Sequence, residues 1–283
     1  MSTATSLLEW LQVRATRPDS FDAAHQPIPS GRAYGGETLA HALAAAVATV
    51  DDDRVLHSFH GFFLRAADVR EHSSYDVTRV RDGRNFSARS VVGRQGERVT
   101  FQGFVSCHVP ADTPARHAMT MPDLPDPESL PTSAEAVAGT AVRDTEYWAH
   151  DRHFDLRHVD PPVYTEPAEP RQARQAVWLK AFRSLPDDPA VHRLALAYVC
   201  DYTLLEPALR RHGAAWAQDG VVTASLDHAM WWHDPGRADE WVALVQDSPY
   251  LGGGLATTRA SLFSRDGRLL ATIAQHGLVH LPE

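Results

Sequence analysis

The sequence is poor in the features that mark secreted or nucleic-acid-binding proteins. Among 283 residues there are only two cysteines, Cys107 and Cys200, and their spacing fits neither a disulfide framework nor a zinc site. This favours a reducing compartment, and we expect a cytoplasmic protein. Acidic residues outnumber basic ones by 36 to 27, which gives a formal net charge of −9. A dense basic surface is therefore absent, and we expect no nucleic-acid partner.

Long apolar runs are also missing. The longest, residues 39–50, is too short to cross a bilayer and contains His41. The N-terminus lacks a cationic stretch followed by an apolar core, so the sequence predicts no signal peptide. We expect no stable membrane insertion. The hydrophobic content of 43% and the charged content of 22% are typical of soluble globular proteins.

Familiar catalytic motifs are absent as well, namely the GxSxG nucleophile turn, the Walker A loop, GxGxxG after a strand, and HExxH. The glycines at 252–254 fall between two predicted strands, where a flexible turn is the simpler interpretation. His57 and His60 lie on one predicted strand at a spacing that would point them to opposite faces. We expect no metal and no cofactor.

What the sequence does contain is an internal repeat with a period of about 170 residues. Residues 81–99 align without gaps to residues 251–269, and Arg89 falls on Arg259. A hairpin turn signal follows at a similar position in each copy. A repeat of this length predicts two copies of one domain within a single chain.

Each copy combines a helix with strands. Residues 36–50 carry leucine and valine at helical spacing and alanine elsewhere, and a helix that is apolar nearly all round is a buried one. Alternation and turn signals predict an antiparallel sheet over residues 57–108. In the second copy, Asp201 precedes a helical segment at 202–209, and four strands are predicted between residues 222 and 280.

The predicted fold class is α+β, with two repeated units that each have a long buried helix wrapped by an antiparallel sheet. A stretch rich in proline and acidic residues separates the copies and predicts a linker. The expected boundaries are 1–29 for an N-terminal helix and lead-in, 30–109 for the first unit, 110–172 for the linker and 173–283 for the second unit.

Three polar residues of the second copy have no counterpart in the first. Asp201 stands at the predicted start of the second helix, where the first copy has Gly36. Ser225 lies on a predicted strand, and Gln275 interrupts an otherwise apolar one. Each has an ordinary structural explanation when taken alone, since Asp is a favoured helix N-cap and the other two could be unremarkable strand residues.

Longer segments resemble type II acyl-CoA thioesterases, which have the double hotdog fold. The resemblance is carried by residues 31–43, 57–65, 80–89, 185–188, 224–233 and 266–277. It covers nearly the whole chain in collinear order. It implies a double hotdog enzyme that hydrolyses acyl-CoA to free fatty acid and CoA, and that assembles as a homodimer or homotetramer.

The resemblance also implies that Asp201, Ser225 and Gln275 are the catalytic residues, with Ser225 where the family commonly has Thr. An ionised Asp can act as general base toward a water that the other two hold, and a helix start at Asp201 would supply N–H groups to the oxyanion. The sequence departs from the family at Glu37, which replaces the usual Gln, and at 66–67, where two alanines replace Pro-Gly.

Gly36, His57 and His60 are further candidates, for substrate binding. A nucleophilic role of Ser225 is disfavoured because no histidine base with an acidic partner is recognisably placed for it. Two other functions are open on this fold. An enoyl-CoA hydratase-like enzyme would need an Asp/His pair in a Gly-Asp-x-Asn-Pro-like context, which is absent. A non-catalytic acyl-CoA or lipid-binding module is the third possibility, and the complete Asp/Ser/Gln set argues against it.

Overall fold

The computed structural model describes residues 6–140 and 144–282, which form two compact units. The first unit runs to Ala118 and adds Leu185–Asp201 and Asp227–His233. The second unit holds Met119–Ser184, Tyr202–Leu226 and the chain from Asp234 onward. The first unit thus includes two segments that the expected boundaries place in the second hotdog unit.

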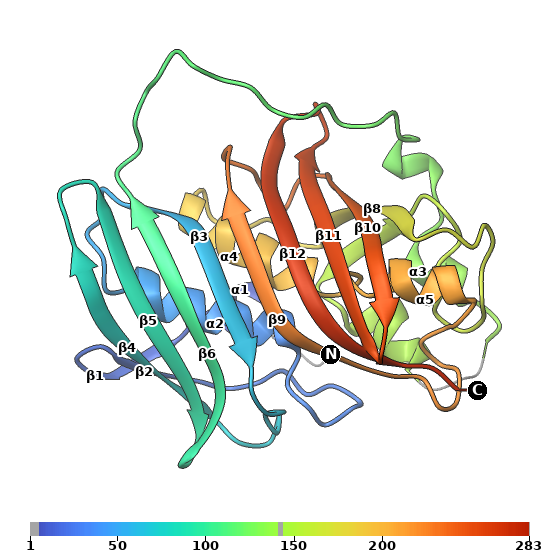
Figure 1. The fold of residues 1–283 in the computed structure, drawn as a ribbon, viewed down its shortest axis with the longest axis horizontal. Coiled ribbons are helices and arrows are strands. Elements are labelled where there is room, and N and C mark those ends of the chain that lie inside the picture. Colours follow the sequence, from blue (N-terminus) through green and yellow to red (C-terminus); the bar gives the residue numbers. More distant parts are fainter. Residues whose placement is uncertain (1–5, 141–143, 283) are drawn as a thin grey trace. The chain divides into compact units, whose positions relative to one another are not determined.

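The first unit is built on an antiparallel sheet with its longest helix packed against one face (Figure 1). Its helices are α1 (Leu7–Trp10), α2 (Gly35–Val47) and α4 (Pro189–Cys200). Its strands, in sheet order, are β1 (Arg14–Arg17), β2 (Ser20–Ala23), β4 (Ser73–Asp82), β5 (Phe86–Gln95), β6 (Arg98–His108) and β3 (Val55–Phe63). Residues 227–231 of β9 (Val222–Trp232) pair with β3.

Helix α2 is buried on nearly all sides, as its sequence predicts. It packs on β4, β5 and β6 with one side and against α4 with another. The small residues make this possible: a methyl group at Gly36 would overlap the backbone oxygen of Tyr198 on α4. Leu39 and Leu43 have no exposed surface, and each such leucine stabilises the fold by about 1.5–3 kcal/mol.

The second unit repeats the arrangement of a helix on an antiparallel sheet. Its strands, in sheet order, are β12 (Leu269–His280), β11 (Leu255–Ser264), β10 (Val242–Gly252), β8 (Arg174–Ala181) and β7 (Phe154–His158). Its helices are α3 (Ser133–Ala136), α5 (Glu206–His212) and the single turns η1 (Pro127–Ser129) and η2 (Tyr147–Asp151). Helix α5 packs on β8, β10 and β11, and residues 222–226 of β9 lie beside β12.

The second buried helix does not lie at residues 202–209, where the sequence analysis places it. Helix α5 has only seven residues, although Glu206 to Arg210 are buried. Pro207 lies in the first turn of α5. Because proline lacks an N–H group, it fits the start of a helix but interrupts a helix interior. The longer helix α4 belongs to the first unit and was not predicted.

The gapless alignment of the two copies is also wrong at its centre. Arg89 is 1% exposed and donates to Thr49 at the end of α2. The side chain of Arg259 is 61% exposed and pairs with Asp247. Since neighbouring residues on a strand face opposite sides, a shift of one residue reconciles the two copies. Both neighbours of Arg259, Thr258 and Ala260, are buried.

The stretch expected to be a linker holds more structure than its composition suggests. Strand β7 pairs with β8 from Phe154 to His158. Val163 and Tyr164 are buried, and Val163 belongs to an apolar cluster with residues of α5. Within residues 6–140 and 144–282, no helix is long and apolar enough to cross a membrane.

Candidate active site

Asp201 lies at the end of a helix and not at the start of one, so its predicted placement is wrong. The N-cap of α4 is Asp188, whose side chain accepts from the Ala190 N–H, and Pro189 follows in the first turn. Helix α4 then continues to Cys200 with Asp201 as its C-cap, and residues 201–205 form a turn. Helix α4 ends at Asp201, so it cannot supply the backbone N–H groups that the sequence analysis expects there.

The Asp201 carboxylate nevertheless lies at a helix N-terminus, that of α2. A methyl group built on Gly35, the first residue of α2, would overlap the Oδ2 atom of Asp201. The N-cap residue Tyr34 makes no side-chain capping bond, and its hydroxyl donates to the Tyr198 oxygen at 2.7 Å. The positive end of the helix dipole favours the ionised carboxylate at this position. This is the form that a general base requires.

Ser225 and Gln275 are joined directly. They lie on β9 and β12, and Gln275 Nε2 donates to Ser225 Oγ at 3.0 Å. Gln275 is buried, on the face of β12 that carries Ile273 and Gly277, so it is no exposed strand residue. An amide N–H cannot accept a proton, so Gln275 is no base for Ser225, consistent with a role of Ser225 in hydrogen bonding.

The structure thus brings together two of the three predicted catalytic residues. Ser225 and Gln275 belong to the second compact unit, whereas Asp201 belongs to the first. The convergence of all three on one water stays a prediction.

His57 and His60 lie on the same face of their sheet, contrary to the sequence-based prediction. The register of β3 against β6 shifts between Leu56 and Ser58, and such a bulge turns His57 to the other side. His57 Nε2 bonds to Ser106 Oγ at 2.8 Å, and burial lowers the pKa of His57, with a smaller effect of His108. His60 is exposed, 4.0 Å from Asp227.

The substrate-binding roles of these two histidines and of Gly36 stay predictions. What the structure adds is that Gly36 packs against α4, where its lack of a side chain is needed.

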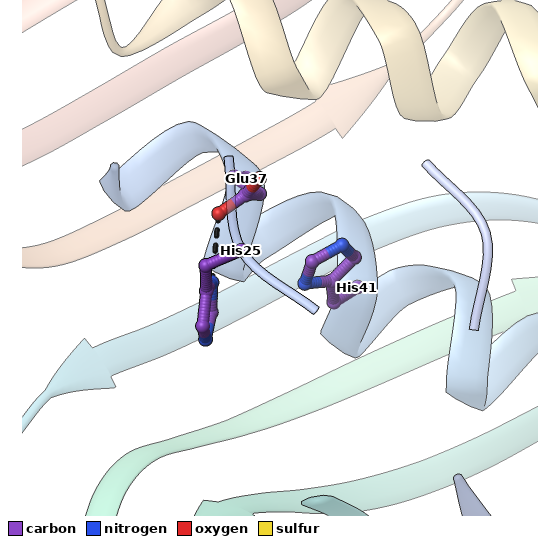
Figure 2. A group of neighbouring side chains, drawn as sticks. All are labelled: His25, Glu37 and His41. Carbon is purple, nitrogen blue, oxygen red and sulfur yellow. Dashed lines mark hydrogen bonds and ion pairs between the residues drawn. The ribbon is translucent and has the colours of Figure 1, made fainter. Parts of the chain in front are cut away.

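A buried polar cluster at the start of α2 was missed by the sequence analysis, and Figure 2 shows its three titratable members. His25 Nδ1 lies 2.7 Å from Glu37 Oε2, and His25 Nε2 lies 2.7 Å from Ser73 Oγ. The second Glu37 oxygen accepts from the Gln26 N–H at 2.8 Å. Glu37, the residue that departs from the family pattern, is therefore bonded at both oxygens within the core.

His41 completes the cluster and is neutral. Its Nε2–H donates to the Trp10 carbonyl at 2.7 Å, so its Nδ1 is an acceptor, which faces the Tyr75 hydroxyl at 3.4 Å. Burial lowers the pKa of His41 to about 4 despite the opposing effect of nearby Glu37. Burial also raises the pKa of Tyr75. Both rings thus stay uncharged at neutral pH.

The donor atoms of His25, Glu37 and His41 lie within 4.8 Å of one another, a spacing that suits a metal ion. Each of these side chains already has protein partners for its polar atoms. The cluster therefore satisfies its own hydrogen bonds, and a structural role at the start of α2 accounts for it.

Comparison with known proteins gives the family. A model of the acyl-CoA thioesterase N-terminal domain matches residues 24–108, and a model of the C-terminal domain matches residues 120–279. The chain belongs to the type II acyl-CoA thioesterases. This confirms the resemblance found in the sequence, and it makes the protein a thioester hydrolase.

Individual relatives agree with the family models. Acyl-coenzyme A thioesterase 8 of Mus musculus is 32% identical over 276 residues, which cover 93% of this chain and 85% of the mouse protein. The structure of an acyl-CoA thioesterase II from Mycobacterium marinum is similar with a TM-score of 0.79 and 33% identity, over 97% of each chain. A hot dog fold protein from Alicyclobacillus acidocaldarius has a TM-score of 0.81 at 18% identity, over 99% of this chain and 100% of that one. The hotdog fold is thereby confirmed.

Proposed function

We propose that this thioesterase hydrolyses acyl-CoA to a free fatty acid and CoA, through a water held by Asp201, Ser225 and Gln275. The observation that carries the proposal is the hydrogen bond from Gln275 to Ser225. It joins a buried amide to a hydroxyl across two strands, at the positions that the family resemblance implies. The cytoplasmic location stays a prediction from cysteine usage.

In the proposed reaction Asp201 is the base. Its ionised carboxylate takes a proton from the water, and the water oxygen bonds to the thioester carbonyl carbon. The tetrahedral oxyanion collapses, the C–S bond breaks, and CoA leaves as a thiolate that takes the proton from Asp201, which restores the carboxylate. The proposed steps need neither a metal nor a covalent acyl-enzyme.

Ser225 and Gln275 position the attacking water. A serine hydroxyl has one donor and two acceptor sites, so Ser225 can bond to Gln275 and to a water at the same time. The Gln275 amide fixes the orientation of that hydroxyl. Holding the water in place lowers the entropic part of the barrier.

A panel of acyl-CoA substrates with thiol release as the readout tests this function. We expect time-dependent release of free CoA with at least one saturated acyl-CoA. Loss of enoyl absorbance without thiol release would favour the enoyl-CoA hydratase-like alternative. Saturable binding of acyl-CoA with neither change would favour the non-catalytic acyl-CoA or lipid-binding module.

We also propose a homo-oligomer, a dimer or a tetramer. Four aromatic side chains that are 41–55% exposed lie on one face of the first unit's sheet, namely Phe62, Phe86, Phe104 and Trp231. This face is opposite to the one that packs on α2. Neighbouring exposed aromatics on one face mark an interaction surface.

Light scattering tests the assembly. We expect a species of at least twice 31.2 kDa. Phe104→Glu should shift it toward the monomer, whereas Tyr250→Glu, at an exposed aromatic of β10, should not. A monomeric wild-type protein at micromolar concentration would contradict the proposal.

A further inference from the structure

The second unit contains a buried arginine surrounded by aromatic rings. Arg152 follows the single π-helical turn η2 and is 6% exposed. Its guanidinium lies 4.6 Å from the ring centre of Tyr202, 5.5 Å from that of Tyr164 and 5.6 Å from that of Tyr147. Arginine stays charged at every physiological pH, so this is a positive charge held inside the protein.

No carboxylate neutralises that charge through a direct contact among the described residues. Arg152 Nη1 donates to the Tyr164 hydroxyl at 3.2 Å, and Nε is buried without a partner in the described chain. Tyr164 in turn bonds to Ser133 Oγ, which donates to the Leu156 carbonyl. All of these acceptors are neutral, and π faces offset only part of the cost of burying a cation.

Two acidic side chains of this region, Glu206 and Asp155, are bonded to other groups. Glu206 is buried and bonded to His158 at 2.8 Å, to Gln175 at 2.7 Å and to Trp216 at 3.0 Å. Asp155 accepts two bonds from Arg157, at 2.9 and 3.0 Å. Arg152 thus has no directly bonded carboxylate, although Glu206 offsets part of the cost of burying its charge.

A cavity adjoins this arginine. Its volume is about 270 Å³, which is roughly nine waters at about 30 Å³ each. Arg152 lines it together with polar side chains, among them Ser133 and the acidic Asp155, and with the apolar side chains of Trp148, Phe154, Leu156 and Phe182. Phe182 is 61% exposed, so one wall of the cavity reaches the surface. None of the three proposed catalytic residues lines it.

We propose that this pocket binds a small monocarboxylate with an apolar body, whose carboxylate pairs with the guanidinium of Arg152. Nη1 bonds to the Tyr164 hydroxyl and Nε has no partner in the described chain, so the guanidinium, whose fork geometry fits a planar carboxylate, is not saturated by protein acceptors. A monocarboxylate brings one negative charge, whereas a phosphate dianion would bring two into a pocket that Asp155 and aromatic side chains already line. The apolar body then contacts those walls.

Calorimetric titration tests the pocket with hexanoate and benzoate as probes. We expect binding of both that is at least tenfold tighter than that of hexan-1-ol, which lacks the charge, and tenfold tighter than that of inorganic phosphate. Arg152→Gln should weaken carboxylate binding at least tenfold. Arg174→Gln removes an exposed arginine of β8 and should leave it unchanged.

A second variant covers the possibility that Arg152→Gln does not fold. Phe182→Glu places a negative charge at the exposed rim and leaves the buried bonds of Arg152 intact, so it should weaken carboxylate binding without lowering the melting temperature. Equal binding of phosphate and hexanoate would overturn the proposal. The proposal would also be overturned if Phe182→Glu and every folded Arg152 variant bound the carboxylates as tightly as the wild-type protein.

Discussion

Acid should destabilise this protein through His41. The unfolded side chain titrates near pH 6.5, whereas burial lowers the pKa of the folded one to about 4. Between these values the unfolded state binds a proton that the folded state does not, so stability falls as the pH is lowered. A change from 6.5 to about 4 corresponds to a loss of about 3 kcal/mol.

The substitution His41→Gln isolates this effect from the titration of carboxylates over the same range. Glutamine can donate to the Trp10 carbonyl and accept from the Tyr75 hydroxyl, as His41 does, but it carries no titrating group. We expect the variant to be less stable than wild type at pH 7 and to lose about 3 kcal/mol less on acidification to pH 4.

Urea unfolding at half-unit steps from pH 7 to pH 4 measures the difference. His72→Gln, the same change at an exposed histidine, is the control and should give a curve parallel to wild type. If His41→Gln also gave a parallel curve, His41 would not be the buried neutral group that the structure shows.

Three further predictions concern the proposed active site and its support. Gly35→Ala should lower kcat at least tenfold in a thiol-release assay, because the new methyl group displaces Asp201, the proposed base. An unchanged kcat would contradict the close contact between Gly35 and the Asp201 carboxylate. Ser225→Ala and Gln275→Ala should each lower kcat roughly tenfold, and Ser225→Thr should be nearly neutral; full activity of both alanine variants would refute the positioning role. His25→Phe should cost about 1–3 kcal/mol in urea unfolding, because it leaves a buried Glu37 oxygen without its hydrogen-bond partner, whereas Glu37→Gln keeps a hydrogen-bonding side chain there and should cost less; equal costs would contradict the importance of this hydrogen bond.

Much of the architecture could be predicted because it depends on local pattern. Alternation and turn signals predicted strands β3 to β6 and β9 to β12, and the alanine-rich run predicted the buried helix α2. The errors lie at positions whose conformation depends on tertiary contacts. The bulge at His57 depends on the pairing of β3 with β6, which single-strand alternation does not show.

The candidate site was predicted in part. The comparison of the two copies singled out Ser225 and Gln275, and the structure joins them. The position of Asp201 was misjudged because the helix signal at Asp188-Pro189 was overlooked, so α4 was absent from the prediction. The partner of Glu37 could not be predicted, since His25 lies in an irregular segment and only folding brings the two together.

The measurement that tests the central claim most directly is the turnover of acyl-CoA by Asp201→Asn, followed by thiol release. Asparagine keeps the shape of the side chain next to Gly35 but removes the proposed base. The account predicts a loss in kcat on the order of a hundredfold or more, with an unchanged melting temperature as evidence of folding. Wild-type turnover by the folded variant would contradict the proposed mechanism.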